Sequence, residues 1–332
     1  MARIFAGGAP VAGRFMELQM FRRPLVALTV VAAFVALAVL GVQAQQPGTI
    51  QFVVGAVDKN GEPLKDLKAE EIIFNEKAGK GTVTKFEPFA LPVKITIAVD
   101  NGNASGDALP HYRAGLKGFV EAFPEDVEMS LYTTSPQPRP VVRPTTDRAA
   151  ILRGVNGFAP ESEAPRFTDA LVEWSQRLEK ESKDTKIKPY VPVMLAVSTT
   201  SAESTSYQPP EIQKWMNNLV QRRARLFVSV NSTRSGDARA TADMNTARQV
   251  IIAVPYTKAL NGRYEAIAIF NRLQTLLPEY GKELADYHKR LTTQYLVTVQ
   301  RASSAGPVEG VAIEIAREGV TGSVSLDGYF PR

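Results

Sequence analysis

The sequence predicts an α/β fold: a doubly wound, mostly parallel sheet, flanked by a small antiparallel β module built from both chain ends. Apolar strands alternate with helical patterns through the middle of the chain, which indicates a parallel sheet covered on both faces. Alternation at period two at both ends is typical of half-buried antiparallel strands. The chain has 332 residues, 44% hydrophobic and 22% charged, which suffices for one large core and a smaller module.

The first 44 residues are predicted to be a targeting segment that stays outside the fold. Arg22 and Arg23 precede an apolar run over residues 24–42, which closes on the small-x-small pattern Val42-Gln43-Ala44. We expect a cleaved signal peptide. The alternative is an N-terminal anchor, because the run approaches the roughly 20 residues that span a bilayer. Both alternatives predict a secreted or periplasmic protein, attached to a membrane only if this segment is not cleaved.

Residues 45–90 are predicted to form a β segment. Asn60-Gly61 favours a tight turn, because this pair supplies the positive φ angles that a short hairpin needs. Gly79-Lys80-Gly81 predicts a second hairpin turn, since no helical pattern follows it as a phosphate loop would require. The expected strands are Ile50 to Val54, Ile72 to Phe74 and Val83 to Phe86.

Residues 91–291 are predicted to form the α/β domain. The expected strands are Val93 to Val99, Val127 to Thr133, Val193 to Ser198 and Leu226 to Val230. The expected helices are Tyr112 to Phe123, Ala149 to Phe158, Phe167 to Glu181 and Glu211 to Arg223. A last helix carries an apolar stripe from Leu273 to Leu291, with a kink or break expected at Pro278.

Residues 292–332 are predicted to form a C-terminal β segment that packs with residues 45–90. Each end supplies only a few short strands, and an isolated hairpin is marginally stable in water, so the two segments are expected to share one apolar core. The apolar positions that alternate along this segment are Tyr295, Val297 and Val299, followed by Val311, Ile313 and Ile315.

Charge and motif content argue against nucleic-acid binding and catalysis. The targeting segment supplies three of the five formal positive charges, which leaves +2 for the rest of the chain. The tight basic cluster of Arg222, Arg223 and Arg225 lies at the end of an expected helix, where the helix dipole favours cations. No phosphate-binding glycine loop, nucleophile elbow or paired-histidine motif occurs, and the two histidines, His111 and His288, fall on or beside helices. The absence of cysteine excludes disulfides, thiolate metal sites and a cysteine nucleophile.

Seven short stretches occur in a characteristic order along the chain. They are VDKNGEPLKDL (Val57 to Leu67), KFEP (Lys85 to Pro88), IAVD (Ile97 to Asp100), NGRY (Asn261 to Tyr264), QYLV (Gln294 to Val297), REGV (Arg317 to Val320) and GYF (Gly328 to Phe330). In this order the chain resembles the bacterial secreted "VWFA-related" proteins, in which a von Willebrand factor type A domain is flanked by short β segments. The resemblance implies that fold for residues 91–291 and a role in binding another protein.

The resemblance also implies a metal-ion-dependent adhesion motif that begins at Asp100, and several of its ligand positions are replaced in this chain. The family binds Mg²⁺ with Asp-x-Ser-x-Ser, a Thr and a second Asp, and Asp100 matches the first ligand. Gly102 and Ala104 stand where the serines belong, Thr168 matches the Thr only with a gap, and Thr199 replaces the second Asp. Mg²⁺ prefers octahedral oxygen geometry with one or two carboxylates, so no metal cofactor is expected. Asp100 is expected instead to cap the turn after its strand.

The sequence therefore predicts an exported, non-catalytic protein-binding module that works without metal. Ligands of doubly wound folds bind at the carboxyl edge of the sheet. The alternative is a metal-dependent adhesion module with a remodelled cation site at Asp100, completed by Ser105, Thr168 and either Thr199 or Glu203. A third alternative is an enzyme with an unrecognised site. The partner is expected to be a protein and not a nucleic acid. The residues expected at the binding crevice are Asp100, Asn101, Asn103, Ser105, Thr168 and Thr199.

Overall fold

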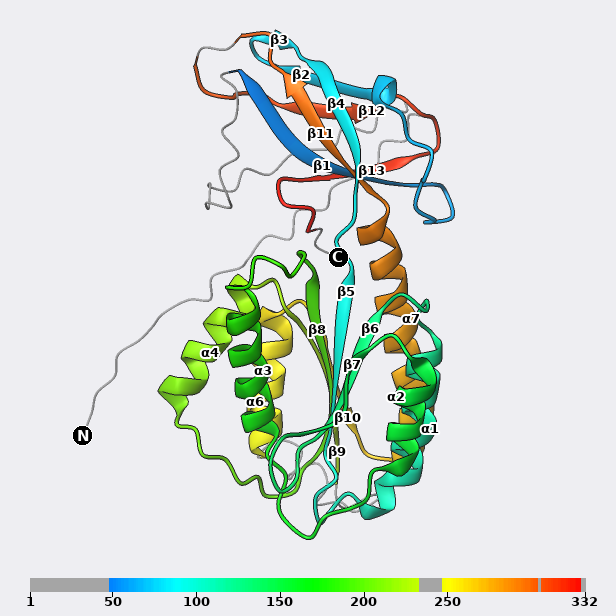
Figure 1. Cartoon of the computed structure of the whole chain (residues 1–332), viewed down its shortest axis with the longest axis vertical. Coiled ribbons are helices and arrows are strands. Elements are labelled where there is room, and N and C mark those ends of the chain that lie inside the picture. The colour runs from blue at the N-terminus through cyan, green and yellow to red at the C-terminus, as the bar shows by residue number, and fades with distance from the viewer. Residues whose placement is uncertain (1–47, 233–246, 304–305, 330–332) are drawn as a thin grey trace, which may run out of the picture.

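The computed structural model describes residues 48–232, 247–303 and 306–329, which form an antiparallel β module and an α/β domain (Figure 1). The targeting segment predicted at residues 1–44 lies outside the described residues. Among the helices in the described ranges, none is both long enough and apolar enough to cross a membrane.

The antiparallel module contains strands from both ends of the described chain. Its strands are β1 (Thr49–Val57), β2 (Ile72–Glu76), β3 (Gly79–Lys80), β4 (Thr82–Phe89), β11 (Gln294–Gln300), β12 (Ala312–Ile315) and β13 (Thr321–Ser325). They form a four-stranded sheet in the order β13-β1-β11-β4 and a three-stranded sheet in the order β12-β2-β3. Phe52 of β1, Phe74 of β2 and Val297 of β11 lie in one shared apolar core, so the two ends of the chain bury each other.

The α/β domain is built on one six-stranded sheet. Its strands are β5 (Val93–Val99), β6 (Glu128–Thr133), β7 (Arg139–Thr145), β8 (Val191–Thr199), β9 (Arg225–Asn231) and β10 (Arg263–Ile267). The order is β10-β9-β8-β5-β6-β7, and every neighbouring pair is parallel except β6 and β7. Every residue of β8 and β9 is buried, as expected for central strands with both faces covered.

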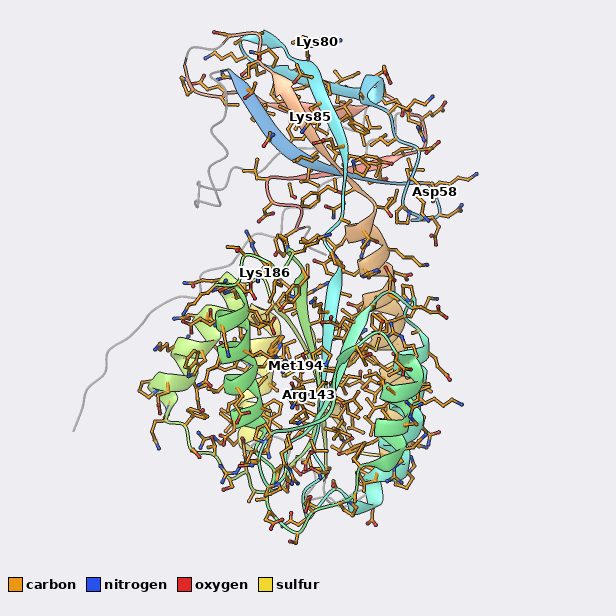
Figure 2. All side chains as sticks on the ribbon, viewed as in Figure 1. Asp58, Lys80, Lys85, Arg143, Lys186 and Met194 are labelled. Atoms are coloured by element: carbon orange, nitrogen blue, oxygen red, sulfur yellow. The ribbon has the colours of Figure 1, made fainter. Side chains whose placement is uncertain are left out.

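Helices cover both faces of this sheet (Figure 1). They are α1 (Leu109–Glu121), α2 (Arg148–Gly157), α3 (Phe167–Glu181), α4 (Pro209–Gln221), α6 (Arg248–Ala259) and α7 (Leu273–Thr292). One face packs against α1, α2 and α7, and the other against α3, α4 and α6. Met194 of β8, labelled in Figure 2, lies in the apolar core between the sheet and α3, α4 and α6, together with Trp174 and Met216. Three short 3-10 helices, Ala69–Glu71, Gly106–Ala108 and Phe270–Arg272, complete the described helical segments.

The predicted fold class is confirmed, and the structure corrects two local predictions. Gly79 and Lys80 are not a turn, because they form β3 and pair with β2, and the turn lies at residues 77–78. The last helix does not break at Pro278, since α7 continues through it. The ring of Pro278 packs against α1 at Gly118, where an added Cβ would lie 2.6 Å from Pro278 Cγ.

Three elements of the α/β domain carry no pattern that the sequence analysis could use. β7 is an edge strand and mostly exposed, so it lacks an apolar alternation. β10 is also an edge strand, and four of its five residues are exposed or half-buried. α6 buries Ile252 and Ala253 but exposes Ile251 and Val254, so its apolar residues do not form a single stripe.

Candidate functional site

Three loops meet at the carboxyl end of the parallel sheet, which is the end far from the antiparallel module (Figure 1). They are residues 101–106 after β5, residues 159–166 before α3 and residues 200–207 after β8. We call them the edge loops. Because parallel strands end on the same side of a sheet, polar residues distant in sequence come together there.

Asp100 follows β5 directly and lies at the buried centre of this edge, with 1% of its surface exposed. Its Oδ1 accepts a hydrogen bond from the backbone N–H of Gly102 at 2.8 Å. Its Oδ2 accepts from the Thr199 N–H at 3.1 Å and from the Thr199 hydroxyl at 2.6 Å, and the Ser198 hydroxyl lies 3.4 Å away. The carboxylate therefore caps the turn after β5 and also joins β5 to the end of β8.

The Asp100 carboxylate belongs to a wider buried polar network. Burial raises the pKa of Asp100, whereas the hydrogen bond from Thr199 lowers it. Burial and the charge of Asp100 both raise the pKa of Tyr112 on α1. The Tyr112 hydroxyl accepts a hydrogen bond from Asn231 Nδ2 at 3.2 Å, and the same amide donates to the Ser198 carbonyl at 2.8 Å. The ends of β8 and β9 are thus tied to α1 at this edge.

Gly102 stands where the resemblance would place the first serine ligand, and the structure leaves no room for a side chain there. A Cβ at this position would lie 2.8 Å from Ser135 Oγ and 2.9 Å from the Glu163 carbonyl oxygen. It would also lie 3.1 Å from Asp100 Oδ1. The space that a serine would need at position 102 is therefore filled by the neighbouring loops.

Asn101 and Asn103 have opposite surroundings. Asn101 is buried; its Nδ2 donates to the Ala159 carbonyl at 2.9 Å, and its Oδ1 accepts from the Ser135 N–H at 3.1 Å. Asn103 is exposed, and its backbone N–H donates to the Glu163 carbonyl at 3.0 Å. Asn101 therefore holds the first two edge loops together, while the side chain of Asn103 faces solvent.

Thr168 and Glu203 form a second buried polar contact at this edge. Thr168 is the second residue of α3, and its backbone N–H donates to Glu203 Oε1 from the third edge loop. Burial raises the pKa of Glu203, and the hydrogen bond from the Thr168 N–H lowers it. In the described ranges the structure thus pairs Thr168 with Glu203 and not with Asp100.

The third edge loop is also fixed to the first turn of α3. The Thr205 hydroxyl donates to Asp169 Oδ1 at 2.5 Å, and Arg166 Nη1 donates to Asp169 Oδ2 at 2.9 Å. The Ser204 N–H donates to the Pro165 carbonyl at 3.0 Å. These bonds join the second and third edge loops, so all three loops are held in one arrangement.

A Mg²⁺ ion held as in the resembled family does not fit these residues. The two oxygens of Asp100 already accept hydrogen bonds from Gly102 and Thr199, and the Ser105 hydroxyl donates to the Gly102 carbonyl at 2.7 Å. Position 102 has no space for a serine, and the backbone N–H of Thr168 ties this residue to Glu203 and not to Asp100. Within the part of the chain that the structure describes, no group of three or more His, Cys, Asp or Glu side chains is arranged to hold a metal.

Sequence reasoning missed three residues of this network. Ser135 comes from the loop after β6, Tyr112 from α1 and Asn231 from the end of β9. Asn231 could have been found, because it is the polar residue that ends a strongly apolar strand, as Asp100 does after β5. Ser135 and Tyr112 carry no such signal, and only the packing of their elements brings them to this edge.

Several solved structures are similar to this fold. A von Willebrand factor type A protein from Catenulispora acidiphila is 8% identical, with 86% of this chain and 75% of that chain covered and a TM-score of 0.44. The conserved hypothetical protein BatB from Bacteroides thetaiotaomicron is 9% identical, with coverages of 58% and 98% and a TM-score of 0.42. The SpRpn10 VWA domain is 11% identical, with coverages of 55% and 94% and a TM-score of 0.38.

The first and last of these are von Willebrand factor type A domains, the type that the sequence resembles. The likeness is one of fold. No protein-family model and no curated protein sequence matches the chain.

Proposed function

We propose that the chain is an exported, non-catalytic protein-binding module whose partner contacts the edge loops without a metal ion. The observation that carries this proposal is the hydrogen bonding of the buried Asp100 carboxylate. Its two oxygens accept hydrogen bonds from Gly102 and Thr199, and these bonds connect the loop after β5 to the loop after β8. A surface held in one arrangement loses little conformational entropy on binding, which favours recognition of another protein.

The exposed residues of the edge loops suit such a surface. Asn103, Ser162, Ser204 and Ser206 are exposed, and each can donate or accept hydrogen bonds. They lie at the carboxyl edge of a doubly wound sheet, where ligands of such folds generally bind. The nearly neutral charge of the chain after residue 44 favours a protein partner over a nucleic acid.

The hydrogen-bonding of the candidate groups supports a role without chemistry. Asp100 is buried and already accepts three hydrogen bonds, so it is poorly placed to act as a base or a nucleophile. His111 bonds with Gln274 through Nδ1, and His288 accepts a hydrogen bond from the Val93 N–H. Both histidines therefore have structural partners.

Metal-dependent adhesion is the second candidate function, and the contact between Thr168 and Glu203 is the observation that favours it. The Thr168 N–H donates to Glu203 Oε1, and the buried Thr168 Oγ1 and Glu203 Oε2 have no hydrogen-bond partner in the described residues. A cation there would use a carboxylate and a hydroxyl, both hard oxygen ligands. Melting experiments with divalent cations, described in the Discussion, distinguish this candidate from the first.

Site-specific photocrosslinking tests the proposed surface. A photoreactive amino acid at exposed position 103 should form a crosslink to one defined protein in the native cell envelope. Lys186 offers a matched control, because it is exposed in the loop before β8, at the other end of the sheet (Figure 2). Similar products from both positions, or none from 103, would argue against the edge loops as the binding surface.

The same experiment can separate recognition from mere proximity. Ser204→Arg and Ala202→Arg add large cations on the exposed third edge loop, without removing a hydrogen-bonded side chain of the edge loops. If the partner contacts this loop, either substitution should weaken the crosslink from position 103. The chain should retain its melting temperature, which would exclude unfolding as the cause.

A further inference from the structure

A pocket of about 370 Å³ lies at the amino end of the six-stranded sheet, opposite the edge loops. Arg225 and Arg263 are the first residues of β9 and β10, and they face residues from the second half of α7. We call it the arginine pocket. Its lining residues are Arg225, Arg263, Glu283, Tyr287 and Arg290.

Arg225 is the most unusual group in this pocket, because its charge is buried. Only 4% of the residue is exposed. Its Nε and Nη2 donate to the Asn261 carbonyl at 3.0 and 2.8 Å, and its guanidinium lies 4.2 Å from the centroid of the Tyr287 ring. No carboxylate forms an ion pair with it in the described ranges. A buried charge without a counter-ion is costly, so an anion bound beside Arg225 would offset that cost.

The other charged groups leave the pocket with a positive balance. Arg263 Nη1 lies 3.2 Å from Glu283 Oε2, so these two charges neutralise each other. Arg290 is exposed, lies near Tyr287 and has no ion pair within the described chain. Burial and the neighbouring Arg290 both lower the pKa of Arg225. With three guanidiniums and one carboxylate, the lining carries two net positive charges.

The NGRY stretch, residues 261–264, builds one wall of this pocket. Asn261 has a positive φ of 49°, a conformation that asparagine tolerates better than most residues, and it turns its carbonyl toward Arg225. At Gly262 a Cβ would lie 1.6 Å from the Leu226 carbonyl oxygen, so glycine is required for this close approach of β9. Arg263 follows as the first residue of β10. The stretch thus orders both Arg225 and Arg263.

We propose that the arginine pocket binds a doubly charged oxyanion of the phosphate class. Two net positive charges match a dianion. Because Nε and Nη2 of Arg225 donate to the Asn261 carbonyl, its Nη1 donors are the ones that face an anion oxygen. Arg225 supplies a buried, preorganised cation, and the exposed Arg290 can close on the anion from the rim. This site is separate from the edge loops and does not depend on the function proposed for them.

Thermal melting with inorganic phosphate tests this proposal. Phosphate should raise the melting temperature in a saturable way, whereas sodium chloride at the same ionic strength should not. Arg290→Gln should raise the apparent dissociation constant for phosphate by about tenfold or more, as expected for a lost hydrogen-bonded charge pair. Arg143→Gln is the matched control, because Arg143 is exposed on β7 at the other edge of the sheet (Figure 2).

Two results would contradict phosphate binding in the arginine pocket. An equal effect of phosphate and chloride would overturn the proposal, and so would an equal loss of phosphate binding in Arg290→Gln and Arg143→Gln. Glycerol phosphate distinguishes the source of the anion. Tighter binding than inorganic phosphate would assign the pocket to a phosphate ester, and equal or weaker binding would assign it to the free anion.

Discussion

The Thr199 hydroxyl donates a hydrogen bond to Asp100 Oδ2 at 2.6 Å and so joins the ends of two adjacent strands that lie 99 positions apart in the sequence. The same threonine also donates its backbone N–H to this oxygen. The Asp100 carboxylate, which occupies the position of a metal ligand in the resembled motif, therefore links the loop after β5 to the loop after β8.

Thr199→Val should destabilise the protein, because it leaves the buried Asp100 carboxylate without its shortest hydrogen bond. We expect a loss of about 1–3 kcal/mol in the free energy of unfolding, measured by urea denaturation. Thr199→Ser keeps the hydroxyl and should lose much less. Equal losses in the two variants would mean that packing of the threonine methyl group, and not the hydrogen bond, is what matters.

Gly102→Ser restores the serine of the resembled motif and should nevertheless be harmful. The new Cβ meets Ser135 Oγ and the Glu163 carbonyl at less than 3.0 Å, so the edge loops must shift. We expect a loss of about 1–3 kcal/mol, typical of overpacking. At Gly106 an added Cβ has no atom within 4 Å, so Gly106→Ser is a matched control in the same loop. A stable Gly102→Ser variant would show that the loops yield easily.

Divalent cations should not stabilise the protein. A cation that bound only the folded state would add about 2.7 kcal/mol at one hundred times its dissociation constant, which corresponds to a rise of several degrees in melting temperature. We expect no such rise with millimolar Mg²⁺, Ca²⁺ or Mn²⁺ relative to EDTA. A rise abolished by Asp100→Ala or by Thr168→Val would instead support the metal-dependent alternative.

His288 should make the protein less stable in mild acid. Burial lowers its pKa below the usual 6.5, although Asp126 opposes this effect. Below pH 6.5 the unfolded chain therefore takes up a proton more readily than the folded one, and stability falls as the pH falls.

Urea denaturation between about pH 7 and pH 5 measures this contribution. His288→Asn keeps an acceptor for the Val93 N–H but cannot titrate, so it should lose less stability over this range than the wild type. A His111→Asn variant measured in parallel tests whether the effect is specific to His288. Identical pH profiles for wild type and His288→Asn would refute the assignment.

Removal of residues 292–332 should destabilise the antiparallel module. This truncation deletes β11, which pairs with both β1 and β4, together with β12 and β13. Phe52 and Phe74 would then lose the apolar partners that cover them. We expect lower solubility and a lower melting temperature. A truncated chain as soluble and heat-resistant as the full one would show that residues 49–89 do not need the C-terminal strands.

The class of fold and the order of its central elements could be predicted from the amino-acid sequence. The predicted bounds of β5 and α3, Val93–Val99 and Phe167–Glu181, agree with the structure residue for residue. Such elements can be predicted because burial imposes an apolar period on neighbouring residues, and that period is local in the sequence. The position of Asp100 could be predicted for the same reason, because it directly follows the apolar residues of β5.

The contacts made by these site residues could be seen only in the folded protein. The crowding of Gly102 by the residue 135 and residue 163 loops, and the pairing of Thr168 with Glu203, depend on loops that no local pattern places together. Arg225 looked like part of a helix-end cluster in the sequence, yet the sheet order and α7 gather it with Arg263 and Arg290 into one pocket. Long-range contacts follow from strand order and helix packing, which short stretches of sequence do not encode.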